Sequence, residues 1–179
     1  MATSFGPSAL ATPANAVTIA RLVIAPFLLL LILGPTESWP ALVLWIALSA
    51  TDGVDGYLAR RQGTTRSGAF LDPLADKVLV VGALLALVAV GRFWWAPVAL
   101  IVAREVAISV YRARVGRQGV SVPARWWAKV KTVVQSLAVG VALLPPAEDV
   151  TWVADGLLWV AVVLTLVTGA QYLLDSRDQ

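Results

Sequence analysis

Long apolar runs dominate this sequence, and short polar segments interrupt them. A helix needs about 20 residues to cross a bilayer core of about 30 Å. Six apolar runs come near that length, and the connections between them, such as TESWP, GRFW and PPAED, are short and rich in turn formers. We therefore predict membrane-spanning helices near residues 16–34, 40–61, 69–91, 94–115, 126–145 and 150–174.

Composition agrees with this pattern and narrows the chemistry. The 179 residues are 59% hydrophobic and 14% charged, whereas soluble domains average about half and a quarter. The chain has no Cys and no His, which excludes thiolate nucleophiles, a His base and zinc bound by either residue. Residues 1–14 are small and contain Gly and Pro, so we expect a mobile segment followed by one domain over 15–179.

Basic residues indicate the orientation in the membrane. If the N-terminus is cytoplasmic, most of them lie at or near the cytoplasmic face, and Arg92 is the one that falls outside. The residues in the inner group are Arg60, Arg61, Arg66, Arg112, Arg114, Arg117, Arg125, Lys129, Lys131 and Arg177. Such an excess of Lys and Arg on one side is typical of cytoplasmic loops, so both termini are predicted to be cytoplasmic.

Charges also enter the inner halves of three predicted helices. The second helix is apolar up to Ala50 and then carries Asp52, the third begins with Asp72 and Asp76, and the fourth carries Arg104 within its span. Charges at that depth must line a wet cavity or pair with one another, because exposure to lipid is costly. The sequence therefore predicts an all-α polytopic bundle of six transmembrane helices, with a polar cavity open to the cytoplasmic side.

Four aspartates in this region have a spacing that could bring them together in one metal site. Asp52 and Asp55 share a helical face, and Asp72 and Asp76 repeat the arrangement on the next helix. Carboxylates on facing helices are how bundles build metal sites. Ligand sets made only of oxygen favour Mg²⁺ or Mn²⁺, and two such ions suit displacement at phosphorus.

A structural salt-bridge network with Arg60, Arg61 and Lys77 is the competing interpretation of these aspartates. Two in-phase pairs of carboxylates with small residues between them would leave that network with an excess of acid. Because clusters of ionisable residues inside a membrane are usually functional, we favour the metal site.

The aspartates belong to a longer motif. From Asp52 to Asp76 the chain reads D-x2-D-G-x2-A-R-x7-G-x3-D-x3-D, which resembles the signature of the CDP-alcohol phosphatidyltransferases. The resemblance implies a dimeric six-helix protein that moves a phosphatidyl group from a CDP-linked lipid to an alcohol and releases CMP. It also implies that Asp52, Asp55, Asp72 and Asp76 hold two divalent ions and that Asp76 is the general base. The residues that would shape the CDP-lipid site are Gly56, Ala59, Arg60 and Gly68.

The resemblance becomes narrower outside the motif. The segments GAFLDPLADK, VARE and AKVKT, and the opening Asn15-x2-Thr18-x2-Arg21, resemble the phosphatidylglycerophosphate synthase subgroup. This resemblance implies CDP-diacylglycerol as donor, glycerol 3-phosphate as acceptor and a role in phospholipid biosynthesis. It also implies an integral protein of the bacterial inner membrane, surrounded by membrane lipids, with its active site in the cytoplasm. We expect a homodimer and no nucleic-acid partner.

Three cations fit an acceptor that carries a phosphate. Arg104 and Arg112 lie close to one helical face, and Lys129 begins the next predicted helix. Cations converging on a cavity that holds metals are suited to binding a phosphate dianion. The alternatives are anchoring to anionic lipid of the inner leaflet and, for Arg104, an ion pair with Glu105.

Two other functions remain open at this point. A cardiolipin synthase of the same family would use phosphatidylglycerol, whose head group also carries a phosphate. A non-catalytic divalent-cation carrier could use the carboxylates as a transport site, but it would not need the G-x2-A-R element and would not release CMP.

Overall fold

The part of the chain that the structure describes, residues 13–34, 39–62, 68–117, 126–145 and 151–175, is built from α-helices and contains no strand. This computed structural model confirms the predicted all-α class, and the observed helices match the predicted runs closely. They are α1 (Pro13–Leu33), α2 (Trp39–Gln62), α3 (Gly68–Ala89), α4 (Trp95–Arg117), α5 (Trp126–Ala142) and α6 (Thr151–Asp175).

Helix ends follow local backbone chemistry. Pro13 begins α1, a position where its missing N–H is no loss, so the last two residues of the predicted segment 1–14 are helical. α5 ends at Ala142, earlier than predicted, because Pro145 has no N–H to continue the helix and disfavours the helical conformation of Leu144 before it. The rest of the segment 1–14 lies outside the described residues.

α3 ends in a motif that requires glycine. Gly91 has a φ of 76°, and its N–H donates to the carbonyl of Val88 at 3.0 Å while the N–H of Arg92 donates to the carbonyl of Leu87 at 2.8 Å. These are the two hydrogen bonds of a Schellman cap. The cap turns the chain directly into α4.

We expect Gly91→Ala to lower the free energy of unfolding by about 1–2 kcal/mol, because a Cβ disfavours a left-handed backbone. Gly156→Ala is the control, since Gly156 lies within α6 and a Cβ there meets nothing within 4 Å. Alanine forms helix better than glycine, so this control should leave stability equal or slightly higher. Unfolding of the purified variants in mixed detergent micelles measures both. Equal losses in the two variants would contradict the role of the cap.

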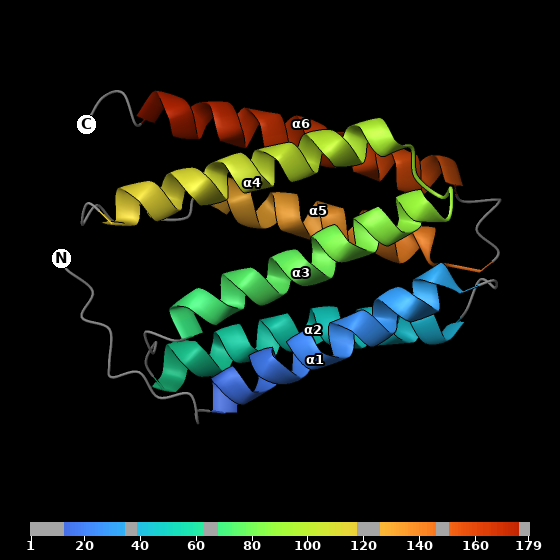
Figure 1. Cartoon of the computed structure of the whole chain (residues 1–179), viewed down its shortest axis with the longest axis horizontal. Coiled ribbons are helices and arrows are strands. Elements are labelled where there is room, and N and C mark those ends of the chain that lie inside the picture. Colours follow the sequence, from blue (N-terminus) through green and yellow to red (C-terminus); the bar gives the residue numbers. More distant parts are fainter. Residues whose placement is uncertain (1–12, 35–38, 63–67, 118–125, 146–150, 176–179) are drawn as a thin grey trace.

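The helices run along the long axis of one bundle (Figure 1). α1 packs against α2 and α3, α6 packs against α5 and α4, and α3 and α5 contact each other and join these two groups. The beginning of α1 and the end of α6 lie at the same end of the bundle (Figure 1). The ends of α2 and α4, which carry Arg60, Arg61, Arg112, Arg114 and Arg117, lie at this end too (Figure 1).

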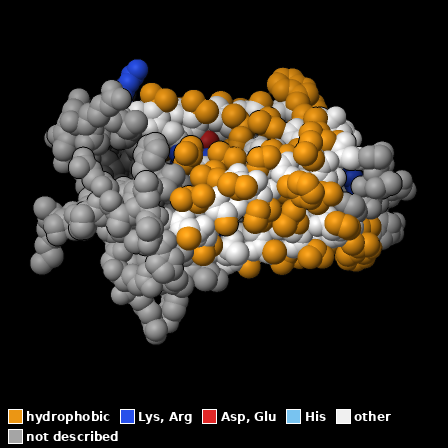
Figure 2. Space-filling model, turned by 60° about the horizontal axis from the view of Figure 1, so that its bottom comes forward, with side chains coloured by type: hydrophobic (Ala, Val, Ile, Leu, Met, Phe, Trp, Pro, Cys, Tyr) orange, Lys and Arg blue, Asp and Glu red, His pale blue; other side chains and the backbone are white. Residues whose placement is uncertain are grey.

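The surface of the bundle is apolar on every helix. Figure 2 shows hydrophobic side chains spread over one face between the two ends, with few charged ones among them. Examples of exposed large residues are Phe27 in α1, Val43 in α2, Trp95 in α4 and Trp152 in α6. Two segments, Asn15–Leu33 and Thr151–Ala170, are long and apolar enough to cross a membrane, with mean hydropathies of 2.6 and 1.9. Such large exposed apolar areas are unusual for soluble monomers and fit a protein surrounded by lipid.

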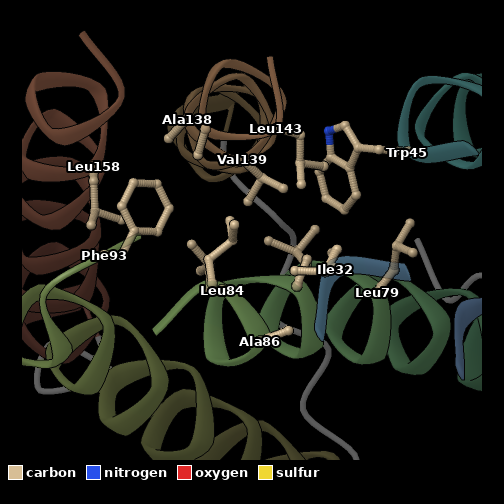
Figure 3. Close-up of a cluster of buried hydrophobic side chains, with 14 of the residues drawn as sticks. Ile32, Trp45, Leu79, Leu84, Ala86, Phe93, Ala138, Val139, Leu143 and Leu158 are labelled. Carbon is tan, nitrogen blue, oxygen red and sulfur yellow. The ribbon is translucent and has the colours of Figure 1, made fainter. Parts of the chain in front are cut away.

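The interior is a single apolar core to which all six helices contribute. Figure 3 shows some of its side chains, among them Trp45 from α2, Leu84 from α3 and Leu158 from α6. The indole Nε1 of Trp45 donates to the backbone carbonyl of Ser136 in α5 at 3.2 Å, so this buried ring has its polar atom satisfied. The core fixes the relative positions of α2, α3 and α5, which surround the cavity described next.

Candidate active site

Asp76 and Arg104 are the predicted site residues whose side chains the structure describes. The others lie on helices, but their side chains are outside the described part: Asp52, Asp55, Gly56, Ala59, Arg60, Gly68, Asp72, Arg112 and Lys129. Their roles stay predictions.

Asp76 lines a cavity of about 570 Å³ between α2, α3 and α5. Ser49, Thr132 and Ser136 add polar atoms to its wall, and the rest of the lining is mostly apolar and extends to Leu42 and Leu144. Three of the lining side chains, Ile46, Val133 and Leu137, are more than half exposed. The cavity therefore joins the carboxylate of Asp76 to an apolar groove that opens on the exposed apolar surface of the bundle.

The helical register around this cavity fits a carboxylate metal site. Ser49 and Ala50 of α2 line the cavity, and Asp52 follows within one turn of the same helix. Asp72 stands one turn before Asp76 in α3. Among the described side chains no three acidic ones come together, but three of the four predicted ligands are not in that set. A donor set of carboxylates alone, on two helices that flank one cavity, suits Mg²⁺ or Mn²⁺.

A largely buried ion-pair network involves Glu105, Arg104 and Lys131 and lies near Asp76. Glu105 of α4 accepts hydrogen bonds from Nη1 of Arg104 at 2.9 Å and from the ammonium of Lys131 in α5. The side chain of Lys131 is 6% exposed and that of Glu105 is 14% exposed. The carboxylate of Asp76 also attracts Lys131 electrostatically. The network thus connects the predicted base on α3 to the predicted acceptor-binding Arg104 on α4.

The ion pair of Arg104 with Glu105, named above as an alternative, is therefore present in the structure. It does not use up the guanidinium, which has five N–H donors. Nη1 binds Glu105, and Nη2 donates to Thr168 of α6 at 3.1 Å. Arg104 can hold Glu105 and still present donors to an anion.

Several residues near Asp76 and Arg104 were not among the predicted site residues. Lys131 is buried and binds Glu105, although Lys129 was the lysine predicted to bind the acceptor. Lys77 donates to the hydroxyl of Ser109, which donates to the backbone carbonyl of Glu105 at 2.5 Å. These contacts brace α3 and α5 against α4 in the polar half of the bundle.

The three polar residues of the opening segment Asn15-x2-Thr18-x2-Arg21, which lie in α1, are buried as well. Asn15, Thr18 and Arg21 are each no more than 1% exposed. Their spacing of three places them on the same side of α1, which packs against α2 and α3. The regular spacing of polar residues in an otherwise apolar helix is the signal by which this buried face could be found.

Comparison with known proteins shows the family of the chain. The family model for CDP-alcohol phosphatidyltransferase matches residues 11–167, so the chain belongs to this family. Together with its apolar helices, this membership identifies an all-α membrane protein.

Relatives with specific names are similar over most of the chain. A protein of Mycobacterium tuberculosis called "Probable phosphatidylglycerophosphate synthase" is 40% identical over 174 residues, which are 93% of this chain and 82% of the relative. Proteins of Sodalis glossinidius and Haemophilus influenzae are each 40% identical, over 169 and 165 residues. The matches cover 89% and 87% of this chain and 92% and 88% of the two relatives. Both are named CDP-diacylglycerol–glycerol-3-phosphate 3-phosphatidyltransferase.

Proposed function

We infer that this protein is a transferase of phospholipid biosynthesis that moves the phosphatidyl group of CDP-diacylglycerol to glycerol 3-phosphate. The products are phosphatidylglycerophosphate and CMP. The observation that carries this inference is the 40% identity, over most of both chains, to transferases named for these two substrates. Membership of a transferase family also removes the reason for considering a cation carrier.

The lining of the cavity fits the proposed donor, CDP-diacylglycerol. A CDP-linked lipid needs a polar site for its diphosphate that continues into an apolar path for its acyl chains. The groove between α2 and α5 begins at Asp76 and is apolar toward the opposite end of these helices. Its lipid-facing opening would let acyl chains stay in the bilayer while the diphosphate lies beside the carboxylates.

Asp52, Asp55, Asp72 and Asp76 would hold two divalent ions, Mg²⁺ or Mn²⁺, which neutralise the diphosphate and stabilise the leaving oxygen when bound. Gly56, Ala59, Arg60 and Gly68 would shape the site for the CDP group. The helical register of Asp52 and Asp72 around the cavity supports this assignment.

The chain's own residues would carry out the remaining steps. A carboxylate oxygen of Asp76 takes the proton of the 1-hydroxyl of glycerol 3-phosphate, and that oxygen forms a bond to the β-phosphorus of CDP-diacylglycerol. The bond from this phosphorus to the CMP oxygen breaks, and CMP leaves with the electron pair. Arg104, Arg112 and Lys129 would bind the acceptor's phosphate through charge-assisted hydrogen bonds. Positioning and charge neutralisation account for most of the rate in phosphoryl transfer.

We also propose the arrangement in the membrane. All six helices would span it, with the polar cavity, both termini and the site at the cytoplasmic face of the bacterial inner membrane and two copies forming a homodimer. The excess of Arg and Lys at one end of the helices supports the orientation. With about 1.5 Å of rise per residue, the 17 residues of α5 and the 25 residues of α6 extend over about 26 and 38 Å, which brackets the bilayer core.

The acceptor is tested with purified protein, CDP-diacylglycerol, Mg²⁺ or Mn²⁺ and one alcohol at a time. We expect a new lipid with glycerol 3-phosphate and none with inositol or serine, read by mass spectrometry of the extracted lipids. Cardiolipin formed from phosphatidylglycerol, with no product from glycerol 3-phosphate, would replace the proposed acceptor with the alternative one.

A further inference from the structure

We propose that Thr168 and Gly169 of α6 are positioning residues that orient Arg104 toward the phosphate of the acceptor. This inference rests on the proposed function and extends it to the last helix, for which the sequence suggested no role. Thr168 and Gly169 are buried where α6 packs against α4.

The hydroxyl of Thr168 is held in a single orientation. It is 2.7 Å from the backbone carbonyl of Leu164 and 3.2 Å from that of Thr165, so its one proton is directed along its own helix. A lone pair of the same oxygen accepts the hydrogen bond from Nη2 of Arg104. A hydroxyl fixed in this way serves as a directed acceptor for the guanidinium.

Gly169 makes room for the stem of the same side chain. A Cβ built on Gly169 would lie 3.3 Å from Nε and 3.5 Å from Cγ of Arg104. The first distance is tighter than ordinary van der Waals contact, so the arginine lies against the bare backbone of α6. Nε itself is buried and has no hydrogen-bond partner among the described residues. A Cβ at position 169 therefore requires a small shift of Arg104.

Together with Glu105, these contacts hold the guanidinium from two sides. Nη1 is bound by Glu105 and Nη2 by Thr168, and the planar fork is rigid. Two fixed hydrogen bonds therefore set the plane of the group and with it the direction of its remaining donors. An arginine that must bind a small dianion gains affinity when its orientation is set in advance.

A purely structural role makes a different prediction. If Thr168 and Gly169 only pack against the partly buried Arg104 and satisfy its hydrogen bonds, their variants should lose thermal stability and should affect the KM values of the two substrates alike. If they position Arg104 for the acceptor, the KM for glycerol 3-phosphate should rise while that for CDP-diacylglycerol stays constant.

The test compares full-length variants in steady-state assays with each substrate varied. Thr168→Val keeps the shape of the side chain but removes the hydroxyl oxygen that accepts the hydrogen bond from Arg104. Because a hydrogen bond to a charged group is lost, we expect about a tenfold rise in the KM for glycerol 3-phosphate. Thr168→Ser should restore the wild-type KM. Gly169→Ala should raise it by a smaller factor, and Gly156→Ala, in an open position of the same helix, should not change it. The KM for CDP-diacylglycerol should stay within about twofold in all four variants, because a twofold change is only a small fraction of one hydrogen bond.

The outcomes separate the inference from the function on which it rests. An active wild type whose Thr168→Val and Gly169→Ala variants keep the KM for glycerol 3-phosphate, or shift both KM values equally, would overturn the positioning role alone. A wild type that makes no phosphatidylglycerophosphate would overturn the proposed function and this inference with it.

Discussion

Asp76→Asn should abolish phosphatidyl transfer and leave the protein folded. The amide cannot take a proton from the acceptor's hydroxyl, and it lacks the charge that a metal ligand supplies. Asp76 lines the cavity and is only partly buried, so the nearly isosteric amide should be accommodated there. CMP release by the purified variant measures the loss, and its elution in detergent by size exclusion reports folding.

Asp155→Asn is the matched control, because Asp155 lies near the beginning of α6 and has no assigned function. It should keep wild-type activity. If Asp76→Asn retained even a tenth of wild-type activity, the barrier would have risen by only about 1.4 kcal/mol. That result would contradict the assignment of Asp76 as both base and ligand.

Glu105→Gln should be the most destabilising single change in the polar half of the bundle. Glu105 balances Arg104 and the buried Lys131, and removing one partner of a buried ion pair costs about 3–5 kcal/mol because the other charge stays uncompensated. Reversible unfolding in mixed detergent micelles measures this loss.

A double variant identifies the cause. Lys131→Met in the Glu105→Gln background removes the leftover ammonium, so it should recover part of the lost stability. Independent sites would instead show additive losses. Additive losses would contradict the ion-pair account. A Glu105→Gln variant whose free energy of unfolding lies within about 1 kcal/mol of the wild type would contradict it too, because that loss is the typical size of one neutral hydrogen bond.

The helices could be predicted from the sequence because each long, largely apolar run is bounded by a short segment of turn-forming residues. The differences lie at helix ends, where local chemistry decides. Gly91 ends α3 through a backbone cap, and Pro145 limits α5. Neither residue changes the count of helices or the order in which they follow each other.

The candidate site could be predicted only in part. The spacing of the aspartates singled out Asp76, which lines the cavity. Lys131 was passed over for Lys129 because both belong to one basic segment. The buried positions of α5, which include Gln135 and Val139, recur in the register of Lys131. That helical register is the signal that would have identified the buried lysine.

The role proposed for α6 could not be found in the sequence at all. Thr168 and Arg104 are 64 residues apart, and nothing in the sequence of either helix links the two residues. Gly169 resembles any helix-packing glycine until the side chain of another helix is seen against it. Contacts between distant segments of the chain depend on the packing of α4 against α6, which no local pattern encodes.

The central claim is a metal-dependent transfer from CDP-diacylglycerol to glycerol 3-phosphate. It is tested most directly in vesicles that hold the purified protein and CDP-diacylglycerol, supplied with glycerol 3-phosphate and with either a chelator or excess Mg²⁺. We expect phosphatidylglycerophosphate and CMP to appear in equal amounts with Mg²⁺, and neither product to form with the chelator. CMP without the phosphatidylglycerophosphate product, or equal turnover in the chelator, would contradict the account.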